Sequence, residues 1–534
     1  MKGSLIGREL FAQAALAQIP HILTLLDRNP HSPSYGCFDR NYWHYRTIDF
    51  PSGMAQEFVL PLALAYELEL PDNPYYHQLS LRQWIEAGML YAARSAHRDG
   101  SCDDYYPYER AAGAAAFSLL ACVQSCALLQ LNNQDIFSFL RRRANWLAGH
   151  HESGRLSNHQ ALIALSLELL SHLLRTDEWD KARDLRLDRV LSWQSAEGWF
   201  QEYEGCDPGY HTLTLSCLAW LYILRPSPKL KEAVIRAVRV ADEFIHPDGS
   251  YGGEYGSRNT YNFFPHGFEL AGKWLPEALS VNDKFLAGLN DGIGPCYDDD
   301  HIIGHHTWNY LLAWRDYVRE RPRLEKRPSG RVVLKDAGIL IDRRHDTELY
   351  VALKKGGVFK LFRDQALIAS DTHLSLKVRS GGKIKNAVGH LVGDYQTDVS
   401  DDEITISGTL GWAKQQFMTT ARLVALRFAM AAFGRFFPDL IRKLLQRKLI
   451  TGKSDAPFQF TRTIKWEGGW RVVDQLRARS WQNVVAAGIG GDQTSIYVVM
   501  SRTFQAGQLS AWLDLTEEIK KLTAGEPLEL VRKF

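Results

Sequence analysis

The sequence predicts a multi-domain α + β protein, in which helical hairpins closing into a ring precede antiparallel β-sheets that carry a helical insertion. Three observations predict this fold. Apolar residues recur at helical spacing through residues 1–325, short alternating runs follow from about residue 331, and polar loops interrupt the helical half at a nearly constant interval. Because 534 residues exceed one ordinary core, at least two domains are expected.

Composition and charge narrow the functional classes. The net charge of +2 gives no whole-protein field for nucleic acid, so no nucleic-acid partner is expected. The sequence holds no run of ~20 consecutive apolar residues, so no membrane span is predicted. The N-terminus lacks a clean apolar core with a small-residue cleavage site, which predicts a cytoplasmic protein. The seven cysteines are odd in number, so we expect buried free thiols.

The helical half has a period close to fifty residues. Segment 230–245 shows the helical texture, with its apolar residues on one face. Six polar, glycine- and aromatic-rich loops are centred near Asp49, Asp103, Ser157, Glu204, Glu254 and Asp300. Their successive centres lie 54, 54, 47, 50 and 46 residues apart. One antiparallel helix pair per repeat would bring all six loops to the same face of a ring.

The β half begins after a charged, proline-bearing linker, Arg319 to Gly330, so we expect domains at 1–325 and 326–534. A helical insertion at 420–453 interrupts the strands. Its segment 422–453 is amphipathic and holds five Arg and three Lys against one Asp, a net charge of +7. Two interpretations stay open, which are peripheral contact with an anionic membrane and packing against the helical ring.

The third loop ends at a predicted helix start. Ser157 is the expected N-cap, which puts Asn158 and His159 in the first turn of a long apolar helix. Free N–H groups and partial positive charge at a helix start suit an anion.

The fourth loop, EGWFQEYEGCDPGYH at 197–211, ends in the same way. Asp207 can cap a helix whose first residue is Pro208, so that Tyr210 and His211 lie in its first turn. We therefore expect two polar pairs, one repeat apart, on the same face.

These motifs resemble the heparinase II/III-like and alginate lyase-like polysaccharide lyases. The resemblance rests on Asn158-His159, the loop 197–211 and the β domain that follows. A family pattern is matched by Glu197-Gly198, Glu202 or Glu204, Asp207-Pro208 and Tyr210-His211. The resemblance implies an (α/α) toroid followed by an antiparallel β-sandwich, and β-elimination of a uronate-containing glycan.

The resemblance also implies catalytic roles. Asn158 and His159 would neutralise the uronate carboxylate, which makes removal of the neighbouring C5 proton easier. Tyr210 would be the acid that protonates the leaving oxygen, and it is also a candidate base. His373 is the alternative base by resemblance, although Ser370 stands where the family has its first histidine.

Further candidates follow from the same loops. Arg258 is the best candidate for binding a carboxylate, and pairing between Glu254 and Arg258 is the alternative interpretation. The full set of predicted substrate-binding residues is His211, Glu254, Tyr255, Arg258, Glu204, Asp103 and Trp199. No cofactor is firmly expected, but a structural zinc in the β domain has the weak candidate ligands His373, His390 and Asp394. The run Asp298, Asp299, Asp300, His301, His305 and His306 also looks metal-like without matching a known zinc pattern.

The sequence thus predicts a lyase acting on an acidic polysaccharide or oligosaccharide, linked to exopolysaccharide metabolism. One alternative is a toroidal glycoside hydrolase with paired acids, Asp103 with Glu254 or Glu202 with Glu204. The other is a non-catalytic protein for glycan binding or exopolysaccharide assembly. The oligomeric state is not predicted.

Overall fold

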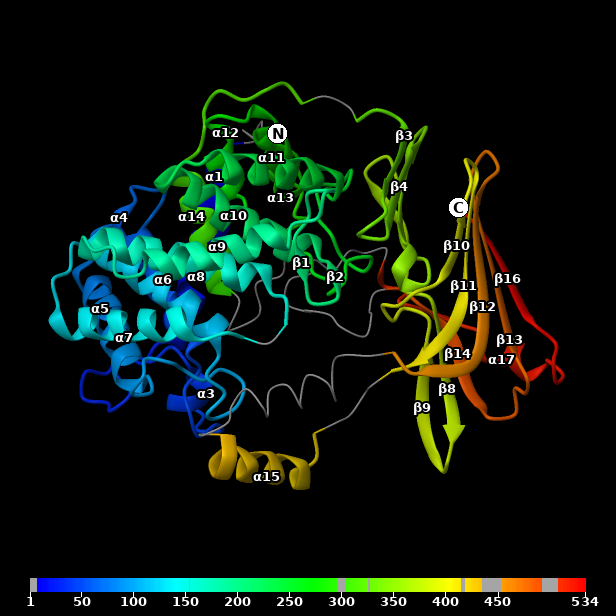
Figure 1. Ribbon diagram of the computed structural model, residues 1–534, viewed down its shortest axis with the longest axis horizontal. Coiled ribbons are helices and arrows are strands. Elements are labelled where there is room, and N and C mark those ends of the chain that lie inside the picture. The colour runs from blue at the N-terminus through cyan, green and yellow to red at the C-terminus, as the bar shows by residue number, and fades with distance from the viewer. Residues whose placement is uncertain are drawn as a thin grey trace.

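A computed structural model describes residues 7–152, 154–294, 303–324, 327–413, 418–434, 453–491 and 508–534. Its N-terminal part is helical (Figure 1). The helices of this domain and the short strands between them are α1 (Glu9–Leu16), α2 (Ile19–Leu25), α3 (Arg40–Trp43), η1 (Met54–Phe58), α4 (Val59–Glu67), α5 (Leu79–Ser95), α6 (Ala112–Leu129), α7 (Gln134–Gly149), α8 (Ser157–Leu174), α9 (Asp180–Ser192), β1 (Gln201–Glu202), β2 (Gly205–Cys206), α10 (Pro208–Leu224), α11 (Pro228–Glu243), α12 (His266–Gly272), α13 (Pro276–Asn290) and α14 (Ile303–Arg315).

The inner helices close into a ring, as predicted. Each of α4, α6, α8, α10, α12 and α14 contacts the next, and α14 contacts α4 again. The helices α5, α7, α9, α11 and α13 each pack against an inner neighbour, and α1 covers α14. The loops before the inner helices therefore share one face of the ring.

Burial follows the sequence pattern. In α11 the predicted apolar face is buried, including Leu230, Val234 and Val238. The inner helix α6 is apolar on all sides, and it is the one described helix long and apolar enough to span a membrane. Because 83% of that window is buried inside the domain, its composition is that of a core helix.

The C-terminal part consists of two antiparallel sheets. The smaller is a five-stranded meander of β3 (Gly330–Leu334), β4 (Ile339–Arg344), β5 (Thr347–Ala352), β6 (Val358–Arg363) and β7 (Ala366–Asp371). The larger comprises β8 (Leu374–Ser380), β9 (Lys383–Val388), β10 (Gln396–Val399), β11 (Glu403–Trp412), β12 (Asp455–Trp466), β13 (Trp470–Ala478), β14 (Val484–Gly490), β15 (Trp512–Asp514) and β16 (Leu528–Lys533), with order β15-β14-β8-β9-β11-β12-β13-β16 and β10 paired to β11. A short helix, α17 (Thr516–Lys520), lies near the C-terminus.

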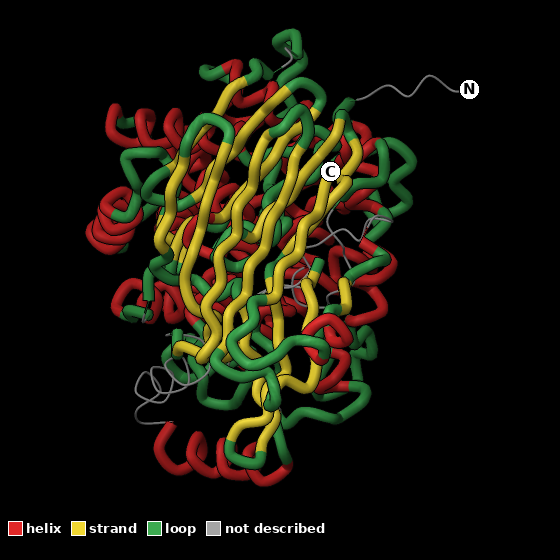
Figure 2. Tube along the Cα trace, turned by 90° about the vertical axis from the view of Figure 1, so that its right-hand side faces the viewer, coloured by secondary structure: helices red, strands yellow, loops and turns green. Residues whose placement is uncertain are grey.

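The smaller sheet lies between the helical domain and the larger sheet, whose strands cover the far side of the molecule (Figures 1 and 2). Alternation places its side chains in two cores. Ile341 and Tyr350 belong to the core shared with the helices, whereas Leu349 and Phe359 pack with Phe460 and others of the larger sheet. This is the predicted toroid followed by antiparallel sheets packed face to face.

A buried ionic cluster crosses the sandwich core. Arg462 of β12 lies 2.9 Å from Asp371 and 2.6 Å from Asp474. Arg532 reaches both carboxylates at 2.7 Å. Burial opposes ionisation of Asp371, but the two guanidinium groups outweigh it and hold its pKa well below the usual range.

The last described toroid helix ends at Arg315 and the first sheet strand begins at Gly330, on either side of the predicted boundary. Polar contacts join the parts. Arg343 of β4 pairs with Glu243 of α11 at 2.7 Å, and the Glu197 carboxylate accepts hydrogen bonds from the backbone of Asp336 and Ala337.

The helical insertion is confirmed as α15 (Thr420–Ala429) followed by a π-helical turn at Met430–Gly434. In Figure 1 it lies near α3, and Arg427 pairs with Asp49 of the first loop at 3.0 Å. Leu423, Val424 and Phe428 are exposed. Residues 435–452 of the predicted basic segment lie outside the described residues.

Candidate active site

The helix starts of α8 and α10 hold the two predicted polar pairs in their first turns. Asn158 and His159 follow Ser157, which begins α8. Ser157 is not the N-cap, because Leu156 occupies that position and the Ser157 hydroxyl donates instead to the carbonyl of Gln201 at 2.6 Å. The third loop is thereby fixed to the fourth.

Asp207 caps α10 as predicted and also binds the fifth loop. One carboxylate oxygen accepts the N–H of Tyr210 at 3.0 Å and the hydroxyl of Thr260. The other accepts the backbone N–H of Arg258 at 3.1 Å. A single buried carboxylate therefore fixes Tyr210 relative to Arg258.

Glu202 of β1 is the buried acid at the centre of this group. Its side chain is 2% exposed. Burial raises its pKa to about 7, although Arg258, His159 and Asn158 all favour the charged form. Glu202 is thus a carboxyl group that exchanges its proton near neutral pH.

Arg258 supplies the positive charge. Its guanidinium lies 4.0 Å from the Glu202 carboxylate, 4.3 Å from the ring centre of Tyr203 and 5.0 Å from that of Tyr210. Burial would lower its pKa, but Tyr210, Tyr203 and Glu202 outweigh this and raise it above the usual range. Arg258 therefore stays charged between two phenol rings.

His159 is oriented by a second carboxylate. Its Nδ1 lies 2.6 Å from Glu152, and its ring lies against Gly113 of α6. A Cβ at Gly113 would lie 2.7 Å from the ring Cε1 and 2.8 Å from Nε2. Burial lowers the pKa of His159 to about 4, so the imidazole is neutral at neutral pH. The charge of Glu152 decides the tautomer of the ring: an ionised carboxylate only accepts hydrogen bonds, which would place the ring hydrogen on Nδ1 and leave Nε2 with a lone pair.

Two buried amides accompany these groups. Asn158 is 1% exposed and its side chain contacts Glu202, whose charged form it favours; among the described residues neither of its amide atoms has another partner with good hydrogen-bond geometry. Within the described part of the chain, the amide atoms of Asn259, next to Arg258, also have no partner with such geometry. Buried amides are normally hydrogen-bonded, so the Asn158 amide beside Glu202 is able to bind a polar ligand at this position.

Several predicted substrate-binding residues lie elsewhere. The ring of His211 hydrogen-bonds the carbonyl of Ala237 in α11 at 2.9 Å, and Trp199 is part of the helical core. Tyr255 is buried against Tyr350 of the smaller sheet. Glu204 is exposed.

Glu254 and Asp103 have structural partners. Glu254 is fully buried and pairs with Lys360 of β6 at 3.0 Å rather than with Arg258. Asp103 contacts His97 at 2.9 Å and accepts backbone N–H groups of its own loop. Asp103 and Glu254, one acid pair predicted for a hydrolase, thus each bind other partners. In the other predicted pair, Glu202 is buried and Glu204 is exposed.

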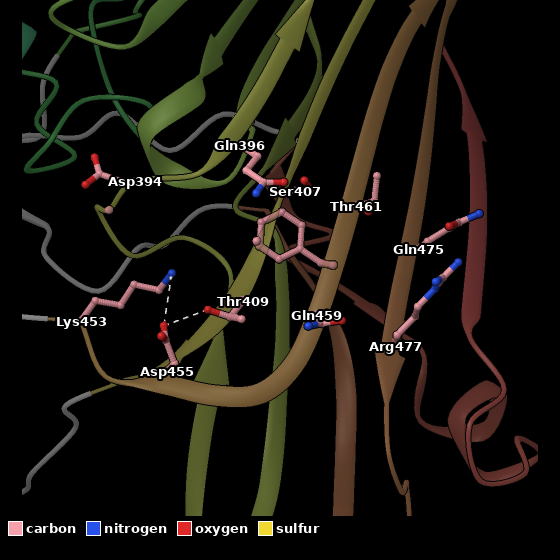
Figure 3. A pocket seen from close by; sticks show the side chains of 13 residues that line it. Asp394, Gln396, Ser407, Thr409, Lys453, Asp455, Gln459, Thr461, Gln475 and Arg477 are labelled. Atoms are coloured by element: carbon pink, nitrogen blue, oxygen red, sulfur yellow. Dashed lines mark hydrogen bonds and ion pairs between the residues drawn. The ribbon is translucent and has the colours of Figure 1, made fainter.

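His373 lies in the β domain and is buried against Phe460. His390 contacts the carbonyl of Thr372 at 3.0 Å. Asp394 lines a polar pocket of ≈ 790 Å³ on the larger sheet, together with groups such as Thr409 and Asp455 (Figure 3). Among the described residues no three His, Cys, Asp or Glu side chains form a metal-binding group. A structural zinc in the β domain therefore stays a prediction.

The metal-like run near residue 300 is only partly described. Asp298, Asp299, Asp300 and His301 lie outside the described residues. His305 pairs with the buried Glu57 of η1 at 2.6 Å, and His306 contacts Asn262 at 3.0 Å.

Glu152 is a residue of this site that the sequence did not predict. It lies seven residues before His159 in the loop HHESGRLSNHQ. An acid upstream of a first-turn histidine, in a loop that must fold back on its own helix, was the available signal.

No family model matches the sequence, and no curated protein matches it. Solved structures resemble it. A mutant of the chondroitin AC lyase from Streptomyces coelicolor superimposes with a TM-score of 0.51 at 10% identity, over 99% of this chain and 79% of that one. A Paenibacillus xanthan lyase matches with a TM-score of 0.48 at 11% identity, over 99% of this chain. Heparinase III matches with a TM-score of 0.44 at 10% identity, over 90% of this chain and 78% of that one.

This chain spans 57% of the length of the xanthan lyase. At such identities a structural likeness speaks for architecture and not for activity. The match to the chondroitin AC lyase shows that the chain shares the helical-toroid and antiparallel-sheet fold of that polysaccharide lyase.

Proposed function

We propose that the protein is a polysaccharide lyase that cleaves a uronate-containing glycan by β-elimination. One observation carries the proposal, which is the convergence of the buried amide of Asn158, the neutral imidazole of His159 and the cation of Arg258 beside Tyr210. Together these groups would meet two requirements of the reaction, which are binding of the uronate carboxylate and proton transfer.

The first requirement is a place for the uronate carboxylate. Arg258 and the Asn158 amide would bind it, which lets negative charge spread into the carboxyl group as the C5 proton leaves. Glu202 has a pKa of about 7, so its protonated form would donate a hydrogen bond to the same carboxylate instead of repelling it.

The second requirement is proton transfer. The Nε2 lone pair of His159 would take the C5 proton, the electrons of that bond would form the C4–C5 double bond, and the bond from C4 to the leaving oxygen would break. The phenol of Tyr210 would give its proton to that oxygen. Arg258 would stabilise the resulting phenolate, since it already lies over the ring.

The test is incubation with a panel of 4-linked uronate polymers while near-ultraviolet absorbance of an unsaturated product is recorded. We expect at least one polymer to give the signal, and Tyr210→Phe to abolish it. An absence of signal from every polymer, or full activity of Tyr210→Phe, would reject elimination at this site.

A hydrolase is the second candidate, and the raised pKa of Glu202 favours it. A carboxyl group that is partly protonated at neutral pH is what a general acid requires. Hydrolysis would give saturated ends, and Glu202→Gln would abolish it while Tyr210→Phe would not. If a glycan instead raises the unfolding temperature and is not consumed, the non-catalytic glycan-binding interpretation is supported.

We also propose that segment 422–453 contacts an anionic membrane surface, near which exopolysaccharide would be handled. The exposed Leu423, Val424 and Phe428 of α15 and the segment's net charge of +7 support this. Co-sedimentation should occur with phosphatidylserine vesicles and weaken in Phe428→Asp. Equal sedimentation of both proteins would reject the contact.

A further inference from the structure

The loop that carries Arg258 is fixed on both sides. Residues 253–260 close on themselves through the N–H of Gly253, which donates to the carbonyl of Thr260 at 2.9 Å. On the helical side, the N–H of Ser257 donates to the carbonyl of Cys206 at 2.8 Å and that of Arg258 to the carboxylate of Asp207 at 3.1 Å. These bonds align the loop with the fourth loop of the ring.

On the other side the loop is bound by the β domain. Lys355 lies in a short 3₁₀ turn (η2, Leu353–Lys355) between β5 and β6, and it is 4% exposed. Its ammonium donates to the carbonyls of Glu254 at 2.7 Å and Gly256 at 2.8 Å. These two carbonyls lie only four and two residues before Arg258.

The turn is shaped to deliver this side chain. Gly356 and Gly357 follow Lys355 with φ of 66° and 91°, which side chains rarely adopt. A Cβ at Gly356 would lie 2.4 Å from the carbonyl of Gly389, so the turn is also closely packed.

A second lysine of the same sheet anchors the start of the loop. Lys360 pairs with the Glu254 carboxylate at 3.0 Å, and Tyr261 donates to the same carboxylate. A Cβ at Gly253 would lie 2.9 Å from the Lys360 ammonium, so loop and sheet are in close contact. Lys355 holds the middle of the loop, at the carbonyls of Glu254 and Gly256, between this anchor and the bonds from Ser257 and Arg258 to the fourth loop.

We propose that Lys355 is a positioning residue for the candidate active site, which fixes Arg258 over Tyr203 and Tyr210 by binding two carbonyls of its loop. Lys355 acts through the loop and not on the glycan. This inference rests on the proposed function for the meaning of Arg258, although the anchoring itself can be measured without any activity.

Charge on Lys355 strengthens the two hydrogen bonds. Burial lowers its pKa to about 7, while Asp207 and Glu254 oppose this shift. The anchoring test is therefore made about one pH unit below that value, where most of the ammonium is charged.

The variants are Lys355→Met and, as the matched control, Lys354→Met. Lys354 is the preceding residue, is exposed and donates to the carbonyl of Asp336 within the β domain at 2.7 Å. Both variants lose one lysine from the same turn, but only Lys355→Met removes the bonds to the loop. If Lys355→Met does not fold, Lys355→Gln, with a neutral donor on a shorter chain, replaces it with the same expected direction.

The first readout is amide hydrogen exchange of peptides covering 253–260. We expect exchange at Ser257 and Arg258 to speed up at least about 10-fold in Lys355→Met and not in Lys354→Met. Unchanged exchange in Lys355→Met would overturn the inference, whether or not any glycan is cleaved. If exchange speeds up but no polymer is cleaved by the unmodified protein, the anchoring stands and the proposed function fails.

The second readout is a double-mutant cycle with Arg258→Ala on a cleaved polymer. We expect Lys355→Met alone to lower kcat/KM by about 10- to 100-fold, because displacing a substrate-binding group such as Arg258 by about 1 Å lowers the rate by up to this factor. In the Arg258→Ala background the same change should have almost no further effect. Equal losses in both backgrounds would show that Lys355 does not act through Arg258.

Discussion

The guanidinium of Arg258 lies 4.0 Å from the carboxylate of Glu202, and both groups are supplied by loops that precede neighbouring inner helices of the ring. The distance is at the limit of an ion pair. An incoming carboxylate can therefore compete with Glu202 for the guanidinium, and protonation of Glu202 would release it. Under the proposed function, this relationship would link glycan binding to proton uptake at the site.

Replacing Tyr210 by Phe should remove the proposed acid and leave the ring over Arg258. We expect kcat to fall at least about 100-fold with a small change in KM, as is usual for loss of a general acid. Initial rates from product absorbance measure this. Tyr76→Phe removes a hydroxyl from an exposed tyrosine and should be fully active.

Activity should fall as pH rises through about 7. Burial raises the pKa of Glu202 to that value, so above it the carboxyl group is ionised and repels a uronate. The pH profile of kcat/KM should therefore lose its alkaline limb in Glu202→Gln. Persistence of the same limb in the variant would assign it to another group, of which Lys355 is the first to examine.

His159→Ala should lower kcat about 100-fold or more, because it removes the proposed base.

Glu152→Gln should lower kcat at least about 10-fold, because the carboxylate no longer fixes the orientation and tautomer of the His159 imidazole. Glu178→Gln, which alters a surface pair with Arg141, is the control and should leave the rate unchanged. A fully active Glu152→Gln would contradict the proposed tautomer.

Arg462→Met should strongly destabilise the β domain. It leaves the buried carboxylates of Asp371 and Asp474 with less compensation, and losing one partner of a buried ion pair costs about 3–5 kcal/mol. Urea unfolding measures this, and Arg471→Met at the surface should change stability by less than about 1 kcal/mol. The difference in unfolding free energy between Arg462→Met and the unmodified protein should become smaller in acid. The native pKa of Asp371 is depressed, so the stability that its ionised form contributes is lost as pH falls.

The ring was predictable from the sequence because the loop period reports the helix pairs directly. The same period predicted that Asn158, Tyr210 and Arg258 would come together. Asp207 was predicted as a cap from local sequence, and its two bonds to Thr260 and Arg258 show why that cap also matters over long range.

Side-chain directions were not predictable in the same way. Successive residues of a helix point about 100° apart, so Tyr210 faces the fifth loop while His211 faces α11. In the fifth loop, Gly252 and Gly253 have positive φ and turn the chain, which sends Glu254 toward Lys360 and Arg258 toward Glu202. A motif gives the composition of such a loop, whereas tertiary contacts decide which residue faces which domain.

Gly113 is the position at which the effect of the His159 ring's location can be separated from the effect of the site's ionisable groups. Its hydrogen atom faces the imidazole of His159, where even a methyl group would lie 2.8 Å from Nε2. Gly113→Ala would keep every ionisable group of the site and every charge, while displacing one ring by a fraction of its own width. The surface of α6 at Gly113 thus sets how far the histidine ring can approach the helix, and adding one methyl group there changes the ring position without changing its chemistry.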